Sequence, residues 1–165
     1  MKKYVLLGVI ALVMLLAVPA AMAGDTTVLS GSINSASSIS VDAPTLSIGT
    51  MEIGNTYDNT NNGLKTMVTV TQTATPSWTL NIKDISGQGM DGHMWASGPK
   101  YLSNALQVWN TASSSWQNVD GVSTPYINGV GTGVQILETD FSQKVASPDV
   151  AGAYQITVQI LLVNL

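Results

Sequence analysis

The chain carries few side chains suited to acid–base or nucleophilic chemistry. His93 is its only histidine, and it lies in the glycine-rich stretch 87–94, where we interpret it as an exposed loop residue rather than a catalytic base. With one histidine and no cysteine, a zinc site would have to rely on carboxylates. Glu138 and Asp140 are two positions apart and can share a face, but nothing in the sequence marks the cleft of a glycoside-hydrolysing pair. We predict no catalytic residues and no enzyme activity.

One loop, residues 55–63, is rich in side chains that carry oxygen, the ligand atom that calcium prefers. Asp58, Asn59 and Asn61 are the candidate calcium ligands. The loop has one formal charge and does not match EF-hand spacing, so the alternative is a set of Asx turns with Asn62-Gly63 as a hairpin turn. Calcium is the one cofactor that the sequence leaves open. No other metal or cofactor is predicted.

The four tryptophans are the other side chains with a chemical use. Trp78 lies on a predicted strand and is assigned to the core. Trp95, Trp109 and Trp116 lie in or beside loops between residues 85 and 128, where exposed rings would form a platform for sugar rings. The alternative is that these three rings cover the open end of a small core.

The elements that must hold these side chains are predicted to be strands. Residues 78–84 alternate strictly, and residues 153–165 repeat the pattern with an outer face that also becomes apolar, which indicates a central or covered strand. The core positions predicted from these two segments are Trp78, Leu80, Ile82, Tyr154, Ile156, Val158 and Ile160. Weaker strands are predicted at 27–33, 38–42, 45–53 (with a bulge or kink at Gly49), 64–73, 106–109 and 134–137. We expect an all-β chain folded as a single antiparallel β-sandwich, immunoglobulin-like or jelly-roll-like.

The first 23 residues have the pattern of a secretory signal peptide. Lys2 and Lys3 precede an apolar run of about 15 residues, which is short of the roughly 20 that a spanning helix needs, and the segment ends in Ala-Met-Ala. We predict a signal peptide at 1–23 and a β-sandwich domain at 24–165. The mature chain has no further long apolar run, so we expect no membrane span in it and a secreted, extracellular or cell-surface location.

Composition excludes several partners. Charged residues make up 10% of the chain, arginine is absent, and the formal net charge is −4 at pH 7. A chain of this kind is not built to bind nucleic acid. The lack of cysteine excludes a disulfide framework and a thiolate nucleophile.

Three segments carry a resemblance to known proteins. They are PTLSIGTMEIGNTY (44–57), MVTVTQTATPSWTLNIKD (67–84), with its Trp-x-Leu triplet, and SPDVAGAYQITVQILLV (147–163). In this order they resemble the WxL-type domain of prokaryotic cell surfaces and, more loosely, the camelysin/TasA-like fibre subunits. The resemblance implies a surface-associated, non-catalytic sandwich.

The ends of the mature chain suggest association. Residues 25–36 contain no lysine and no proline, and the last predicted strand has no charged tail, so both lack the devices that normally protect sheet edges. Our first hypothesis is a structural subunit of a surface layer, sheath or fibre, in which residues 25–36 act as an exchanged strand; an ordinary first strand is the alternative. Its partner would be itself or another cell-surface protein. The second hypothesis is a monomeric adhesion module that binds a cell-wall polysaccharide through the three loop tryptophans.

Overall fold

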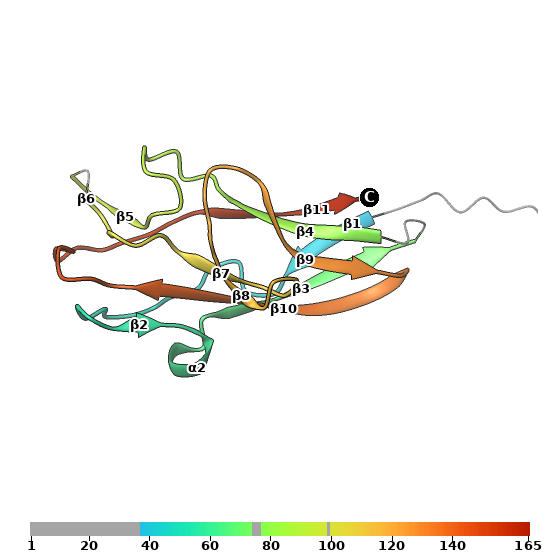
Figure 1. Ribbon diagram of the computed structural model, residues 1–165, viewed down its shortest axis with the longest axis horizontal. Coiled ribbons are helices and arrows are strands. Elements are labelled where there is room, and N and C mark those ends of the chain that lie inside the picture. Colours follow the sequence, from blue (N-terminus) through green and yellow to red (C-terminus); the bar gives the residue numbers. More distant parts are fainter. Residues whose placement is uncertain (1–36, 74–76, 99) are drawn as a thin grey trace, which may run out of the picture. The chain divides into compact units, whose positions relative to one another are not determined.

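The computed structural model describes residues 37–73, 77–98 and 100–165 (Figure 1). They belong to one compact unit that spans residues 35–165. The predicted signal peptide at 1–23, and the segment 24–36, lie outside the described residues. The described part of the chain is almost entirely β-structure in antiparallel sheets, which confirms the predicted all-β class and is compatible with a β-sandwich.

The larger sheet has six strands. Along the sheet the order is β1 (Ser37–Val41), β3 (Lys65–Gln72), β10 (Gly133–Lys144), β7 (Gln107–Asn110) and β8 (Ser115–Asn118), while β2 (Thr56–Tyr57) also pairs with β10. Every pairing in this sheet is antiparallel.

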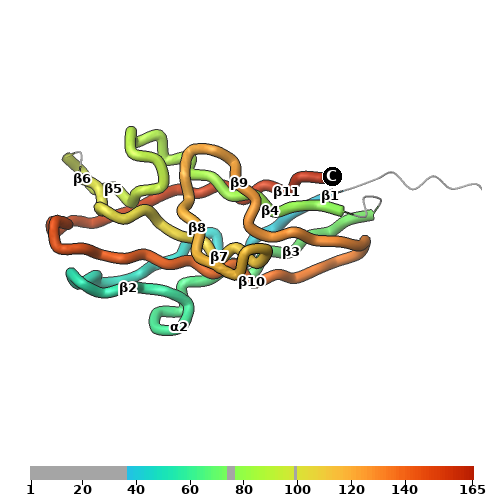
Figure 2. The backbone as a smooth tube through the Cα atoms, in the orientation of Figure 1, coloured from blue at the N-terminus to red at the C-terminus, as the bar shows by residue number. Residues whose placement is uncertain are grey.

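The second sheet has three strands, in the order β11 (Val158–Asn164), β4 (Ser77–Asp84) and β9 (Thr124–Val130). A small ribbon is formed by β5 (Trp95–Ala96) and β6 (Lys100–Tyr101). The chain leaves β10 at Lys144, reverses, and returns along the other sheet into β11 (Figure 2). The one helix among the described residues is α2 (Asn59–Asn62), a single turn.

The core lies between the two sheets and centres on β4. Trp78, Leu80 and Ile82 are completely buried, as their alternation along the strand requires. Full burial of an aliphatic side chain of this size contributes about 1.5–3 kcal/mol to folding. Trp78 packs so closely on Gly129 of β9 that a Cβ at that position would lie 2.0 Å from the indole ring, so only glycine fits there. The larger sheet contributes fully buried valines to the same cluster: Val68, Val70 and Val108.

Two predicted strands differ from the structure. Residues 45–53 do not form a strand; Leu46 and Ile48 still pack on the core, and the kink expected at Gly49 is present as a positive φ of 76°. The last strand begins at Val158 rather than at residue 153, and it lies at the edge of its sheet rather than in the centre. Both segments have the alternation of strands, but 45–53 pairs with no strand of the described residues, and β11 is paired on one side only.

The predicted hairpin turn at Asn62-Gly63 is also wrong. Asp58 caps α2 by accepting hydrogen bonds from the backbone N–H groups of Thr60 and Asn61, and the Asn61 side chain accepts one from the Asp58 N–H. Gly63 ends the turn in the left-handed conformation. The polar loop is therefore a capped helical turn that leads into β3.

Candidate functional site

An apolar groove of about 1130 Å³, which we call the edge groove, lies beside β1 and β11, the strands at one edge of each sheet. Its lining includes Ile39 and Val41, residues 43–51 and 53 of an irregular segment, and residues 149–158 and 160. Asp149 is the only charged side chain in its lining. Its carboxylate is turned to backbone partners, so the surface offered by the groove is largely apolar.

One wall of the groove consists of four side chains that the sequence assigned to the core: Tyr154, Ile156, Val158 and Ile160. They are half-buried, unlike the completely buried residues of β4. Ile156, Val158 and Ile160 pack on the core cluster with one side, while the other side faces the groove. Their alternation therefore reports an apolar face that the described residues cover only in part.

The backbone N–H and C=O groups of the even-numbered residues in this wall point away from β4. Thr157 O accepts a hydrogen bond from Ile85 N (2.9 Å), and Gln155 exchanges two backbone bonds with Trp95, so the odd-numbered residues bond toward β4 and β5. In an antiparallel ladder the even-numbered residues then direct their N–H and C=O groups to the opposite side. The even positions from 154 to 160 thus present apolar side chains to the groove, and those from 154 to 162 present backbone groups to an edge that no strand of the described residues pairs with.

The edge of β1 has the same character. Asp42 N donates to Met67 O (3.1 Å), which places the bonds to β3 on the even-numbered residues of this strand. Ile39 and Val41 therefore direct their backbone groups away from β3 and their side chains into the groove. The two sheets present equivalent edges on the same side of the molecule.

A polar clasp joins the end of β11 to the start of β1, where the C-terminus lies (Figure 1). Ser37 Oγ donates to Gln72 Oε1 (2.6 Å), Gln72 Nε2 donates to Asn164 Oδ1 (2.5 Å), and Asn164 Nδ2 donates back to Ser37 Oγ (3.1 Å). Gln72 is almost fully buried, so these bonds compensate for the desolvation of its amide. The clasp ties the first described strand to the last.

Asp149 lines the groove at the chain reversal between β10 and β11. Its two carboxylate oxygens accept hydrogen bonds from Ser103 N and Ala146 N, each at 2.7 Å. Burial acts to raise the pKa of this carboxyl, but the backbone hydrogen bonds outweigh burial, and the pKa lies below its usual value. The charged form of Asp149 thus fixes the chain reversal that leads into the groove wall.

The predicted tryptophan platform is brought together only in part. Trp109 on β7 and Trp116 on β8 are register partners, with ring centroids 5.3 Å apart in an edge-to-face arrangement, and Trp116 is 37% exposed. Trp95 lies on β5, where its backbone pairs with Gln155, and no ring contact joins it to the other two within the described residues. A sugar platform would therefore use two rings, not three.

Glu138 and Asp140 share the outer face of β10, as expected. Lys65 Nζ forms an ion pair with Glu138 (2.6 Å), which lowers the pKa of Glu138, whereas burial and then the neighbouring Glu138 raise the pKa of Asp140. The two carboxyl groups influence each other's pKa, and neither of them lines the edge groove.

The candidate calcium ligands have protein partners. The oxygens of Asp58 and Asn61 cap α2, and Asn59 Nδ2 donates to Glu138 Oε1 (3.3 Å). No group of three or more histidine, cysteine, aspartate or glutamate side chains gathers into a metal-binding arrangement in the part of the chain that the structure describes. Calcium binding at this loop stays a prediction.

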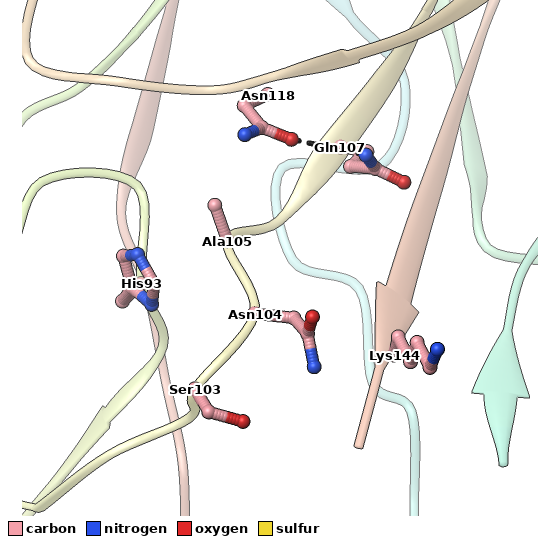
Figure 3. A pocket seen from close by; sticks show the side chains of 7 residues that line it. All are labelled: His93, Ser103, Asn104, Ala105, Gln107, Asn118 and Lys144. Atoms are coloured by element: carbon pink, nitrogen blue, oxygen red, sulfur yellow. Dashed lines mark hydrogen bonds between the residues drawn. The ribbon is translucent and has the colours of Figure 1, made fainter. Parts of the chain in front are cut away.

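His93 lines a smaller polar pocket of about 430 Å³, with Lys144 on the other side of the 103–105 loop (Figure 3). His93 Nδ1 lies 2.6 Å from Leu102 O and donates to that carbonyl. Asp149, whose pKa His93 lowers slightly, accepts from backbone N–H groups instead. The histidine is thus not linked to a carboxylate as a catalytic triad requires.

Comparison with known proteins adds no assignment. No model of a known protein family matches the chain, and no curated protein matches it. None of the helices formed by the described residues is long and apolar enough to cross a membrane. The sequence analysis did not identify the edge groove, because the residues that line it alternate as core strands do. The alternating apolar residues in 45–53 and 153–160 were the available signal.

Proposed function

We propose that this protein is a secreted, non-enzymatic structural subunit of a cell-surface layer, sheath or fibre, assembled through β-strand pairing between copies. The finer fold assignment, a β-sandwich of the immunoglobulin-like or jelly-roll-like kind, and the kinship with WxL-type or camelysin/TasA-like domains belong to the same proposal. The single observation that carries it is the pair of unprotected sheet edges beside the apolar edge groove.

The contrast with the other edge of the smaller sheet supports this reading. Strand β9 contains Pro125, and its register with β4 shifts between Leu80 and Asn81, both of which are devices that discourage a further strand. Strands β1 and β11, with the sequences SSISV and VQILLVN, contain no proline, no lysine and no charge. An edge left in this state is a template for another chain.

The test is assembly of the mature chain from Gly24. Light scattering and negative-stain microscopy at rising concentration should show filaments or sheets. Ile39→Lys, which places a charge at the unprotected edge, should suppress them. Ile136→Lys is the matched control, because Ile136 is 64% exposed on the outer face of β10. A strictly monomeric particle at every concentration would overturn the proposal.

A second candidate function, glycan binding, is favoured by the exposed Trp116 ring beside Trp109. Cell-wall polysaccharide would then change the tryptophan fluorescence in a saturable way. Trp116→Ala should abolish the change, and Trp95→Ala should preserve it, because Trp95 lies on another element. Unaltered binding by the Trp116 variant would contradict this function.

A further inference from the structure

The edge groove has the features of a sheet position that lacks its strand. Its wall offers a free backbone edge from residue 154 to residue 162, about 30 Å of extended chain. Apolar side chains line the groove at the even positions of that edge from 154 to 160. The sequence predicts strands both for this wall and for residues 45–53 on the other side of the groove, yet the described residues supply no strand between them.

A segment of suitable length and chemistry exists outside the described residues. Residues 25–36 would span about 40 Å when extended, enough to follow the whole free edge. Between Thr26 and Val41 the chain carries no charged side chain, which suits a groove with an apolar surface. Leu29 and Ile33 fall on one face of an extended strand, with Gly31 between them.

The point at which this segment joins the fold selects which copy it would serve. It leads into Ser37, which the clasp ties to Gln72 and Asn164. To enter its own groove the chain would have to reverse within residues 34–36. A segment donated from a neighbouring copy needs no such reversal, and donation from copy to copy gives a head-to-tail contact that repeats without closing.

We propose that residues 25–36 of a second copy occupy the edge groove, pairing with the free edge at 154–162 and placing Leu29 and Ile33 against its apolar wall. This inference rests on the proposed function and deepens it, because it names the donated segment and its acceptor. The bonds formed would be main-chain hydrogen bonds along the edge, with apolar contacts in the groove setting the register.

Disulfide capture tests this contact, because the natural chain contains no cysteine. Mature Ile33→Cys protein is mixed with Ile160→Cys protein, and separately with Ile156→Cys protein, under mild oxidation. We expect a mixed disulfide dimer with at least one of the two acceptor variants. Val134→Cys, 66% exposed on the outer face of β10, is the matched control and should link at least tenfold less.

The outcomes separate the two proposals. Filaments without any Ile33 link to the groove would overturn this inference and leave the structural function standing. Monomers without links would overturn both. A chain carrying Ile33→Cys and Ile160→Cys together that links within itself at high dilution would show that the segment serves its own copy, and would also overturn the inference.

A second test does not depend on disulfide formation: it mixes a variant that lacks the donor segment with a variant that lacks the acceptor groove. Leu29→Lys/Ile33→Lys protein would lose the donor, and Ile156→Lys protein would lose the acceptor, so each alone should remain monomeric. Mixed in equal amounts they should form one-to-one dimers, since one copy retains the donor and the other retains the groove. Monomers in the mixture, with each variant showing the native circular dichroism spectrum, would contradict strand donation.

Discussion

Strands β4 and β11 have the same alternating sequence pattern, but their apolar faces are buried to different extents. On β4, Leu80 and Ile82 are completely buried under the larger sheet, whereas Leu162 and Ile160, their register partners on β11, are only half-buried, and Ile160 lines the groove. Alternation thus identifies a face that needs cover, but it does not say whether the same chain supplies that cover. Among the described residues, the apolar face of β4 is fully covered, and that of β11 is covered only in part; we call these the closed half and the open half.

The largest expected effect separates these halves directly. Ile82 and Ile160 are register partners, so Ile82→Ala and Ile160→Ala remove the same atoms at adjacent positions. Ile82→Ala should lower the free energy of unfolding of the monomer by about 2–5 kcal/mol, because it leaves a cavity in a closed core. Ile160→Ala should cost roughly 1 kcal/mol, because solvent already reaches that side chain. Urea unfolding measures both, and equal losses would erase the distinction between the two halves.

A glycine on each side gives a smaller, independent comparison. Gly129→Ala would drive a Cβ into the Trp78 ring and should cost about 1–3 kcal/mol. Gly152→Ala on the groove side meets Ala96 Cβ at 3.1 Å and the Tyr154 ring at 3.3 Å, contacts that this looser region can accommodate. Thermal unfolding should show the larger drop for Gly129→Ala. The reverse order would place the rigid packing on the groove side.

Acid should lower the free energy of unfolding by protonating Asp149, which lines the edge groove. Its usual pKa is 3.8, and in the folded protein the pKa is lower despite burial, because backbone N–H groups of Ala146 and Ser103 bond the charged form. The stability from these bonds is complete above pH 3.8 and is lost as the pH falls through the folded value. Unfolding at pH 3 and pH 7 should therefore differ less in Asp149→Asn than in the unaltered protein. Ile82→Ala should keep the full pH dependence, and an unchanged dependence in Asp149→Asn would refute this role.

The smallest effect is expected on the outer face of β10, which belongs to neither half. Burial first, and then repulsion by Glu138, raise the pKa of Asp140. Glu138→Gln should lower that pKa without returning it to its usual value, as carboxyl ¹³C NMR titration can measure. Asn59→Ala keeps both charges and should change it less. A rise in the Asp140 pKa in Glu138→Gln would contradict the repulsion.

The sequence predicts the parts of the fold in which apolar side chains alternate and find a partner. Strand β4 is the clear case. Sequence-based prediction fails for most of β10, because the buried positions there include the polar residues Thr139 and Gln143. Thr139 is hydrogen-bonded to Tyr126 (3.1 Å), and half of the strand therefore has no apolar alternation. It also fails at 45–53, where the pattern of a strand is present without a neighbouring strand.

Prediction of the candidate site was limited by long-range pairing. Trp109 and Trp116 come together because β7 and β8 form a hairpin, and sequence spacing alone does not separate them from Trp95. The edge groove depends on which strands lie at the sheet edges, and alternation carries no information about sheet order. The cap of α2 has a local sequence signal that the hairpin interpretation overlooked, since Asp58 and Asn61 have the spacing of a capping box and Gly63 follows.

The polar clasp has a mechanical consequence. If the proposed filament of donated strands forms, tension would pass from one subunit to the next through Ser37, which the clasp joins to both Gln72 and Asn164. A pull along β1 loads its five register pairs with β3 in parallel, as shear, rather than opening them one after another as a zipper. The contact between subunits would thus be attached to a strand that resists extension through all five of its register pairs at once.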